Sequence, residues 1–550
     1  MSVRISNLVL LVAGALAVSG PAVAAPAVAH GALSQTERAY ADWLDATYAV
    51  STLSAGTVAK IDGRGRAAWE ASLKQQAAVL KAGLDRAARL KLHGEAARAL
   101  RHMQKAFADP PAAPVTTTTQ EAGARCETAP NASLDRAALS AALYGCFERF
   151  GNHISFEGRT IARTTALELL QELDASERRK ALFDALSPLW RRINADGAPG
   201  SPYRRLIRLS ANEARAKGSS RIVDAARTVG ASPGQVETWL VSALERWRDA
   251  NPGPAMEPWD YWNHYASGVR PLDPLIPPQR ITALSFAYYR DLGLDLQAVG
   301  AIHDLGVRPG KAPLAYADFI RIGRETPSGW RPALARVSGN VEKGGLFVLN
   351  EIVHEDGHVA HMMAVRTRPA FFDLGDDLFV EAFADVTSWA VADPRWQQRY
   401  LGSSVDEAVG KRALFANVML DVAWGLFELR MLRDPQADPN AVWTQITSRY
   451  LNIRPHPEVS WWALRVQLVD SPGYMINYGL GAVVTADLRR RFREQAGDFD
   501  AGDPRWYRYA SDHLLRFGGS APTPKLLRRF LGRPASDEAL LAEIARIERR

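Results

Sequence analysis

Cysteine is nearly absent from this chain of 550 residues, which contains only Cys126 and Cys146. Two cysteines cannot build a disulfide-rich scaffold, and neither belongs to a CxxC or Cys/His pattern typical of a structural zinc site. In an oxidising compartment the pair would form one disulfide that closes a local loop. The alternative is two unpaired thiols, and the sequence leaves that choice open.

Long apolar runs and basic blocks are also missing. Beyond the N-terminal segment, no stretch approaches the roughly 18 consecutive apolar residues of a membrane-spanning helix. The net charge is +7, but Arg and Lys are interspersed with Asp and Glu and form no basic block with interleaved aromatic residues. The charge is therefore interpreted as a solvated surface, with a mild preference for substrates that carry carboxylates. No nucleic acid is expected as a partner.

Residues 1–29 begin with a short basic segment, continue with an apolar stretch and end in small residues. This composition is typical of a secretory signal peptide, with cleavage expected after Ala24 or Ala29. A permanent membrane anchor is the alternative, but glycines and a proline shorten the apolar run. The expected mature protein is exported, periplasmic or extracellular, and keeps no stable membrane anchor after signal cleavage.

Helical periodicity dominates the rest of the chain. Apolar residues recur every three or four positions in 30–108, whereas the prolines and threonine run of 109–125 predict an exposed loop or linker. The helical pattern resumes in 126–550, which is expected to form the main body. Alternating apolar residues predict strands only at 314–322 and 333–338. The predicted fold class is therefore mostly α, with a small β-sheet next to the segment that carries the chemistry.

That segment is HEDGH, at residues 354–358. On a helix, His354 and His358 lie one turn apart on the same face, so both imidazoles can ligate one metal ion. Glu355 lies about 100° around the same turn, where it can act as general base on a water that the metal activates. The alternative is an ordinary helix with two hydrogen-bonded histidines.

A carboxylate downstream favours the metal interpretation. Glu381 lies in an apolar helical stretch, and two histidines with one carboxylate make a catalytic zinc site that keeps one open position. Asp385, one turn later, is placed to accept the second ring proton of a ligand histidine. His361 is interpreted either as a residue that supports a ligand or as a structural residue, and three acidic residues nearby are interpreted as solvated or capping charges: Asp356, Asp376 and Asp377.

HEDGH followed at this distance by EAFAD (381–385) resembles the zinc-binding helices of the angiotensin-converting enzyme family of gluzincin peptidases, and more distantly those of thimet oligopeptidase. The resemblance implies His354, His358 and Glu381 as ligands of one Zn²⁺, with Glu355 as base and acid. It also implies a large two-lobed helical fold with a deep central cleft, over which the N-terminal helices would form a lid.

Weaker matches follow in the order that the family shows. GYMINYGLGAVVTADL (473–488) resembles the tyrosine-bearing helix, which implies Tyr478, and less closely Tyr474, as substrate-binding and oxyanion-stabilising residues. The family places a histidine shortly before these tyrosines. The corresponding stretch here has no histidine, but it contains Arg465 and Gln467, which are interpreted as substrate-binding residues.

The predicted function is zinc-dependent hydrolysis of short peptides, of the carboxydipeptidase or oligopeptidase type. Arg465 would hold a C-terminal carboxylate through a bidentate contact. The alternatives are a catalytically inactive exported protein that binds zinc or peptides on the same fold, and a protein that stores or delivers metal. Internal and terminal cleavage are both compatible with the sequence.

Overall fold

The computed structural model describes residues 24–110, 119–308, 311 and 314–548. Most of these residues are helical and the strands are few and short, which confirms the mostly α fold class. The predicted signal peptide lies largely outside the described residues; only its end, from Ala24 on, is placed, at the start of a helix. None of the described helices combines the length and the apolar character that crossing a membrane requires.

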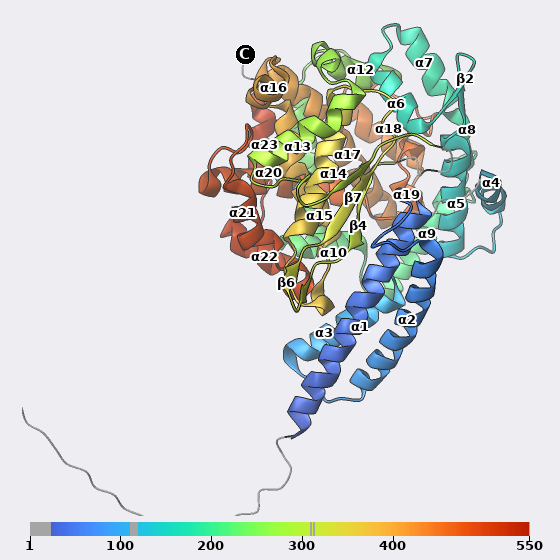
Figure 1. The fold of residues 1–550 in the computed structure, drawn as a ribbon. Helices are drawn as coiled ribbons and strands as arrows, with labels where there is room; N and C mark the ends of the chain where they lie inside the picture. The colour runs from blue at the N-terminus through green and yellow to red at the C-terminus, as the bar shows by residue number, and fades with distance from the viewer. Residues whose placement is uncertain (1–23, 111–118, 309–310, 312–313, 549–550) are drawn as a thin grey trace, which may run out of the picture.

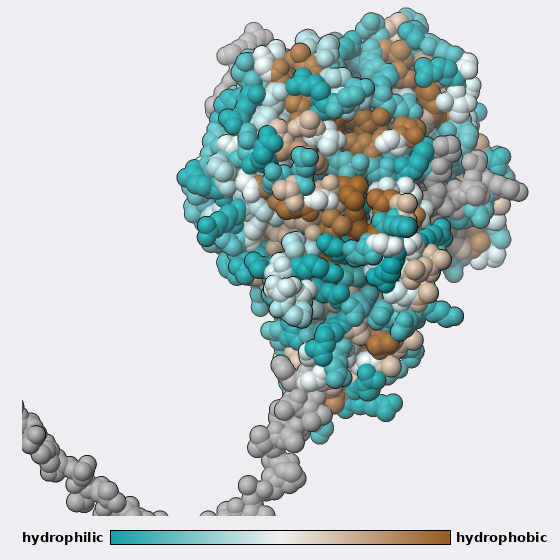
Figure 2. Space-filling view, in the orientation of Figure 1, coloured by the Kyte–Doolittle hydropathy of each residue, from teal (hydrophilic) through white to brown (hydrophobic). Residues whose placement is uncertain are grey.

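Three helices form the N-terminal region, where helices are predicted: α1 (Ala24–Ser54), α2 (Arg66–Ala88) and α3 (Gly94–Ala108). α1 and α2 lie side by side and extend below the main body (Figure 1). Ion pairs attach α1 to the body, with 2.8 Å between Arg368 and Glu37. On the face shown in Figure 2, hydrophobic residues gather toward the centre of the body, and hydrophilic residues cover most of the rest. The lid function of these helices stays a prediction.

The prediction of a loop at 109–125 is wrong at the C-terminal end of that range. Residues 119–125 belong to helix α4 (Thr119–Thr128), which packs against α5 (Arg136–Gly151). The sequence of α4 is polar and has little apolar periodicity, so no local pattern indicates a helix there. Contacts with α5 hold it in place, which is a tertiary effect that overrides weak propensity.

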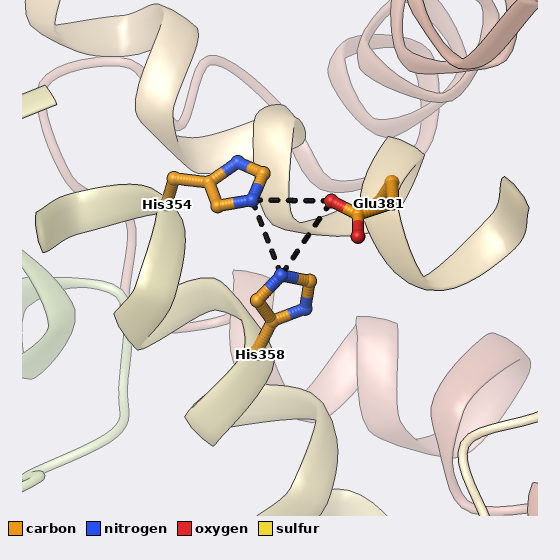
Figure 3. Close-up of side chains that lie close together, drawn as sticks. All are labelled: His354, His358 and Glu381. Atoms are coloured by element: carbon orange, nitrogen blue, oxygen red, sulfur yellow. Dashed lines mark hydrogen bonds and ion pairs between the residues drawn. The ribbon is translucent and has the colours of Figure 1, made fainter. Parts of the chain in front are cut away.

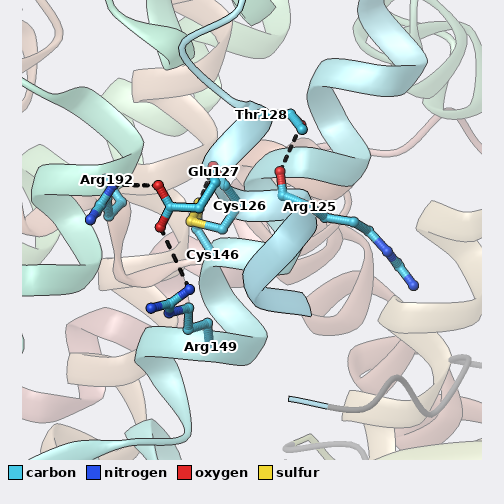
Figure 4. The surroundings of a disulfide bond; sticks show 7 residues. All are labelled: Arg125, Cys126, Glu127, Thr128, Cys146, Arg149 and Arg192. Atoms are coloured by element: carbon cyan, nitrogen blue, oxygen red, sulfur yellow. Dashed lines mark hydrogen bonds and ion pairs between the residues drawn. A yellow bond between two sulfur atoms is a disulfide. The ribbon is translucent and has the colours of Figure 1, made fainter. Parts of the chain in front are cut away.

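A disulfide between Cys126 and Cys146 joins these two helices (Figure 4). The cysteines are therefore bridged, as the first of the two alternatives predicted. The helices approach closely at Gly145, where a Cβ atom would lie 2.8 Å from the carbonyl oxygen of Ala122. Larger side chains would separate the helices and with them the two sulfur atoms.

A helical block with one hairpin follows. The antiparallel hairpin consists of β1 (Ile154–Phe156) and β2 (Arg159–Ile161). The helices are α6 (Arg163–Glu172), α7 (Ser176–Ala185), α8 (Ser187–Asn194), α9 (Pro202–Lys217), α10 (Arg221–Val229), α11 (Pro233–Ala250), α12 (Tyr261–Ala266) and α13 (Ile281–Asp291).

The predicted sheet precedes the HEDGH segment and contains both predicted strands. Its order is β3–β7–β4, with β7 parallel to β3 and antiparallel to β4. The strands of this sheet are β3 (Ile302–Asp304), β4 (Tyr316–Arg321) and β7 (Leu334–Ser338). Between β4 and β7 in the sequence, β5 (Arg324–Thr326) and β6 (Gly329–Arg331) form a separate antiparallel hairpin. β4 and β7 pack against the HEDGH helix, which confirms the predicted position of the sheet.

Helix α14 (Leu346–Ala364) carries HEDGH and is buried on nearly every side. α15 (Asp377–Ser388) packs along α14, and α20 (Ile476–Ala496) packs along α15. Gly357 permits the first contact, because a Cβ atom there would lie 2.7 Å from Ala384 Cα. The remaining helices of the C-terminal part are α16 (Pro394–Leu401), α17 (Glu407–Arg433), α18 (Pro439–Tyr450), α19 (Gln467–Asp470), α21 (Trp506–Ala510), α22 (Thr523–Leu531) and α23 (Glu538–Ala545).

Candidate metal centre

The side chains of His354, His358 and Glu381 point toward one another between α14 and α15 (Figure 3). The Nε2 atoms of the two histidines are 3.1 Å apart, and they lie 3.4 Å and 3.8 Å from Oε2 of Glu381. In a tetrahedral zinc site with bonds of about 2.0–2.1 Å, ligand atoms are separated by about 3.3 Å. The three atoms therefore have the spacing that one small divalent ion needs.

Asp385 orients the first histidine. Its Oδ1 lies 2.7 Å from Nδ1 of His354 and also accepts a hydrogen bond from Ser388 Oγ at 3.1 Å. A carboxylate at Nδ1 accepts a hydrogen bond from the N–H of that nitrogen, which keeps the proton there and leaves the lone pair of Nε2 for a metal. The predicted role of Asp385 matches this geometry.

Buried polar atoms around the centre have no partner in the described part of the chain. They include Oε2 of Glu355 and Nδ1 of His358. Burial raises the pKa of Glu355 to about 8. The positive charge of His354 lowers this pKa, but by less than burial raises it. Burial and the neighbouring His354 lower the pKa of His358 to about 4. A cation between these groups would stabilise the ionised carboxylates and the neutral imidazoles, so the residues present fit a bound metal ion.

Two tyrosines approach the centre, Tyr474 from the turn before α20 and Tyr478 from the first turn of that helix. The hydroxyl of Tyr474 donates a hydrogen bond to Oε1 of Glu381 at 2.8 Å, which leaves Oε2 for the metal. Tyr478 contacts Gln467, and burial raises its pKa, with a further rise from the charge of Glu381. The sequence ranked Tyr478 first, but the tyrosine bonded to the predicted ligand is Tyr474.

Arg465 lies beside Tyr478 and is already engaged. It forms an ion pair with Asp421, and its guanidinium carbon lies 4.9 Å from the ring of Trp424 and 5.8 Å from that of Tyr478. The histidine upstream of this stretch, His456, is bound elsewhere, to Glu257 and Glu458 at 2.8 Å and 2.7 Å.

The prediction that Asp356 is a solvated or capping charge is wrong. Asp356 is fully buried and binds Nε2 of His303 at 2.8 Å and Oγ of Ser285 at 2.6 Å. Asp356 is about 200° around α14 from His354, so it points away from the candidate metal centre toward β3 and α13. From the sequence, the pair of Asp356 and His303 could have been found only if the pattern had shown that both faces of α14 are buried.

The other secondary assignments agree with the structure. Asp376 caps the N-terminus of α15 by accepting from the backbone N–H of Leu378. His361 is buried against the rings of Phe379 and Phe383 and lies outside the ligand cluster. It is a structural residue, as one of its two interpretations predicted.

No family model and no curated protein matches this chain. The functional interpretation therefore depends on the site itself and on the resemblance of its motifs.

Proposed function

We propose that this protein is a zinc-dependent peptidase of short peptides, similar in mechanism to the angiotensin-converting enzyme family that its motifs resemble. The observation that carries this proposal is the convergence of His354, His358 and Glu381 from two packed helices, with Glu355 on the same helix turn. Structural zinc sites have four protein ligands, whereas three leave one position for water and substrate. Two imidazoles and one carboxylate are a donor set that suits zinc.

The bound ion would polarise the scissile carbonyl and acidify a water molecule. Glu355 takes the proton of the attacking water and passes it to the leaving amine. Tyr474 donates a hydrogen bond to Oε1 of Glu381 and so orients the carboxylate, whose other oxygen would bind the ion. Tyr478 is the proposed donor to the developing oxyanion, since its ring centre lies 5.8 Å from that of Tyr474, which binds Glu381.

Burial of the centre supports short peptides as the substrates. The side chains of His354, His358 and Glu381 are 16%, 11% and 12% exposed, so a folded protein surface cannot reach them. The disulfide supports export to the periplasm or the extracellular space, because disulfides persist in oxidising compartments.

Replacing Glu355 by Gln tests this proposal. The wild-type protein should contain about one zinc ion per chain and cleave a mixture of short peptides; a chelator should stop cleavage and added zinc should restore it. Glu355→Gln should keep its zinc and lose at least about 10²-fold in kcat/KM. The control is Glu325→Gln, the same substitution at an exposed residue of β5.

Metal analysis and peptide mass spectrometry provide the two measurements. Wild-type cleavage rates in Glu355→Gln would refute the role of this residue as the base. Zinc binding without hydrolysis by the wild-type protein would favour the alternative, a catalytically inactive protein that binds zinc or peptides.

A further inference from the structure

Helices α17 and α20 approach each other closely at a pair of glycines. A Cβ atom on Gly425 would lie 3.4 Å from Gly479 Cα and 3.2 Å from the carbonyl oxygen of Met475. Gly425 and Glu428 are three residues apart on α17, so they share one face of that helix. The close approach therefore brings the side chain of Glu428 to the N-terminal end of α20.

Glu428 binds the backbone of the segment that precedes α20. Its Oε2 accepts a hydrogen bond from the backbone N–H of Met475 at 2.9 Å, and the residue is only 1% exposed. The first N–H groups of a helix have no partner within the helix, so a carboxyl at this end satisfies one of them. Burial raises the pKa of Glu428 to about 8, against the pull of the N–H groups of Gly473 and Met475. The contact ties α17 to the start of α20 in the interior of the protein.

The segment before α20 contains a tight turn. Its four residues are Ser471, Pro472, Gly473 and Tyr474, and the N–H of Tyr474 donates to the carbonyl oxygen of Ser471 at 2.9 Å. A proline in the second position and a glycine with a φ of +91° in the third are typical of a type II turn. The turn holds the backbone on one side of Tyr474, and the hydrogen bond to Glu428 holds it on the other.

Tyr474 extends from this turn to the candidate metal centre. Its hydroxyl donates to Oε1 of Glu381 at 2.8 Å, while Oε2 of this carboxylate is 3.4 Å and 3.8 Å from Nε2 of His354 and His358. A hydrogen bond is lost when its atoms separate beyond about 3.5 Å, so a shift of about 1 Å at Tyr474 is enough to release the carboxylate. The backbone at Met475 therefore controls how Glu381 presents its other oxygen to an ion.

We propose that Glu428 is a positioning residue of the metal centre, which holds the turn before α20 so that Tyr474 can orient Glu381. The proposal rests on the zinc site of the proposed function but not on peptide hydrolysis. Residues that orient a metal ligand commonly contribute about 10- to 100-fold to metal affinity. Because Glu428 acts through Tyr474, the two residues should contribute the same part of the affinity and not separate parts.

Zinc affinity in a double-mutant cycle tests this role. Glu428→Leu removes the hydrogen-bond acceptor at nearly the same volume, and Tyr474→Phe removes only the hydroxyl. Each substitution should weaken zinc binding about tenfold, measured by competition with a chelator. The double variant should bind zinc no more weakly than Tyr474→Phe alone, because the contact with Glu381 is already lost.

Two further variants separate positioning from a general loosening of the fold. Glu428→Gln keeps an oxygen that can accept from Met475 and should bind zinc within about threefold of the wild type. Phe415→Leu is the matched control, at a fully buried residue of α17 that lies about 20 Å along the helix from Glu428. It should lower the melting temperature and leave the zinc affinity unchanged.

Cobalt in place of zinc provides a readout of the ligand geometry. Glu428→Leu and Tyr474→Phe should shift the visible absorption bands of the Co²⁺ protein in the same way, whereas Phe415→Leu should keep the wild-type spectrum. Circular dichroism shows whether each variant is folded. If Glu428→Leu does not fold, Glu428→Asp replaces it, since its carboxyl is withdrawn by one methylene from Met475. Additive losses of affinity in the double variant, or wild-type affinity in folded Glu428→Leu or Glu428→Asp, would overturn the inference.

Failure of the zinc site gives a different result. If the wild-type protein binds no zinc, the proposed function is wrong, and hydrogen–deuterium exchange of the zinc-free protein decides whether Glu428 holds the turn. The amides of residues 473–476 should then exchange at least about tenfold faster in Glu428→Leu than in the wild type, because the N–H of Met475 has lost its acceptor. Unchanged exchange would refute the positioning role.

Discussion

Two clusters of buried charge lie against helix α15, and their charge is balanced in different ways. In the first, Asp500 is fully buried between Arg489 and Arg493, and Arg489 also donates to the backbone carbonyl of Val386 on α15. Burial opposes ionisation of Asp500, but the two arginines outweigh it and hold the pKa of this carboxyl well below its usual range. The chain itself therefore neutralises the charge of this cluster.

The second cluster is the candidate metal centre. In the described part of the chain, no Lys or Arg forms an ion pair with Glu381 or Glu355. Burial raises the pKa of Glu355, the opposite of the shift at Asp500. A structural cluster contains its own counter-charges, whereas this centre presents anions and imidazoles that a cation from outside can stabilise.

Substitution of Asp500 should have the largest effect on stability. Asp500→Asn leaves buried arginines without their anion, and we expect a loss of about 3–5 kcal/mol in the free energy of unfolding. Zinc content should not change. Denaturant unfolding measures the loss, with Asp249→Asn at an exposed residue as the control. A loss below about 1 kcal/mol would show that the cluster does not depend on its internal charge balance.

Acid should weaken the first cluster through Glu543. Lys411 and Arg493 overcome the effect of burial and lower the pKa of Glu543 to about 2. A carboxyl with a depressed pKa stabilises the fold above its unfolded pKa of about 4.5, and this contribution is lost as pH falls toward the folded value. The expected contribution is about 3 kcal/mol. The stability difference between wild type and Glu543→Gln should thus shrink from about pH 6 to about pH 3; a constant difference would contradict this linkage.

Substitution of Glu355 should have the smallest effect on stability and the opposite sign. In zinc-free protein, Glu355→Gln removes a buried carboxyl that lacks a partner among the described residues, and we expect a gain of up to about 2 kcal/mol. Thermal unfolding after dialysis against a chelator measures it. If Glu355→Gln lowered the free energy of unfolding as much as Asp500→Asn, the carboxylates of both clusters would be balanced by the chain itself, and the contrast between the clusters would be wrong.

The candidate metal ligands could be predicted because their arrangement is largely local. His354 and His358 share a helix face, and so do Glu381 and Asp385, through the 3.6-residue period alone. Asp356 could not be predicted, because its partner His303 belongs to β3, some fifty residues earlier, and no local pattern relates the two. The polar helix α4 was missed because its contacts with α5, not its sequence, hold it in place.

The sequence by itself determined the mostly α class, the position of the small sheet and the helix faces that carry the two histidines and the two acids. Backbone geometry within a few residues decides these features. Only the tertiary structure placed Glu381 against the histidines, bridged Cys126 and Cys146, and paired Asp356 with His303. These contacts join distant segments, and the packing of helices around a shared core decides them.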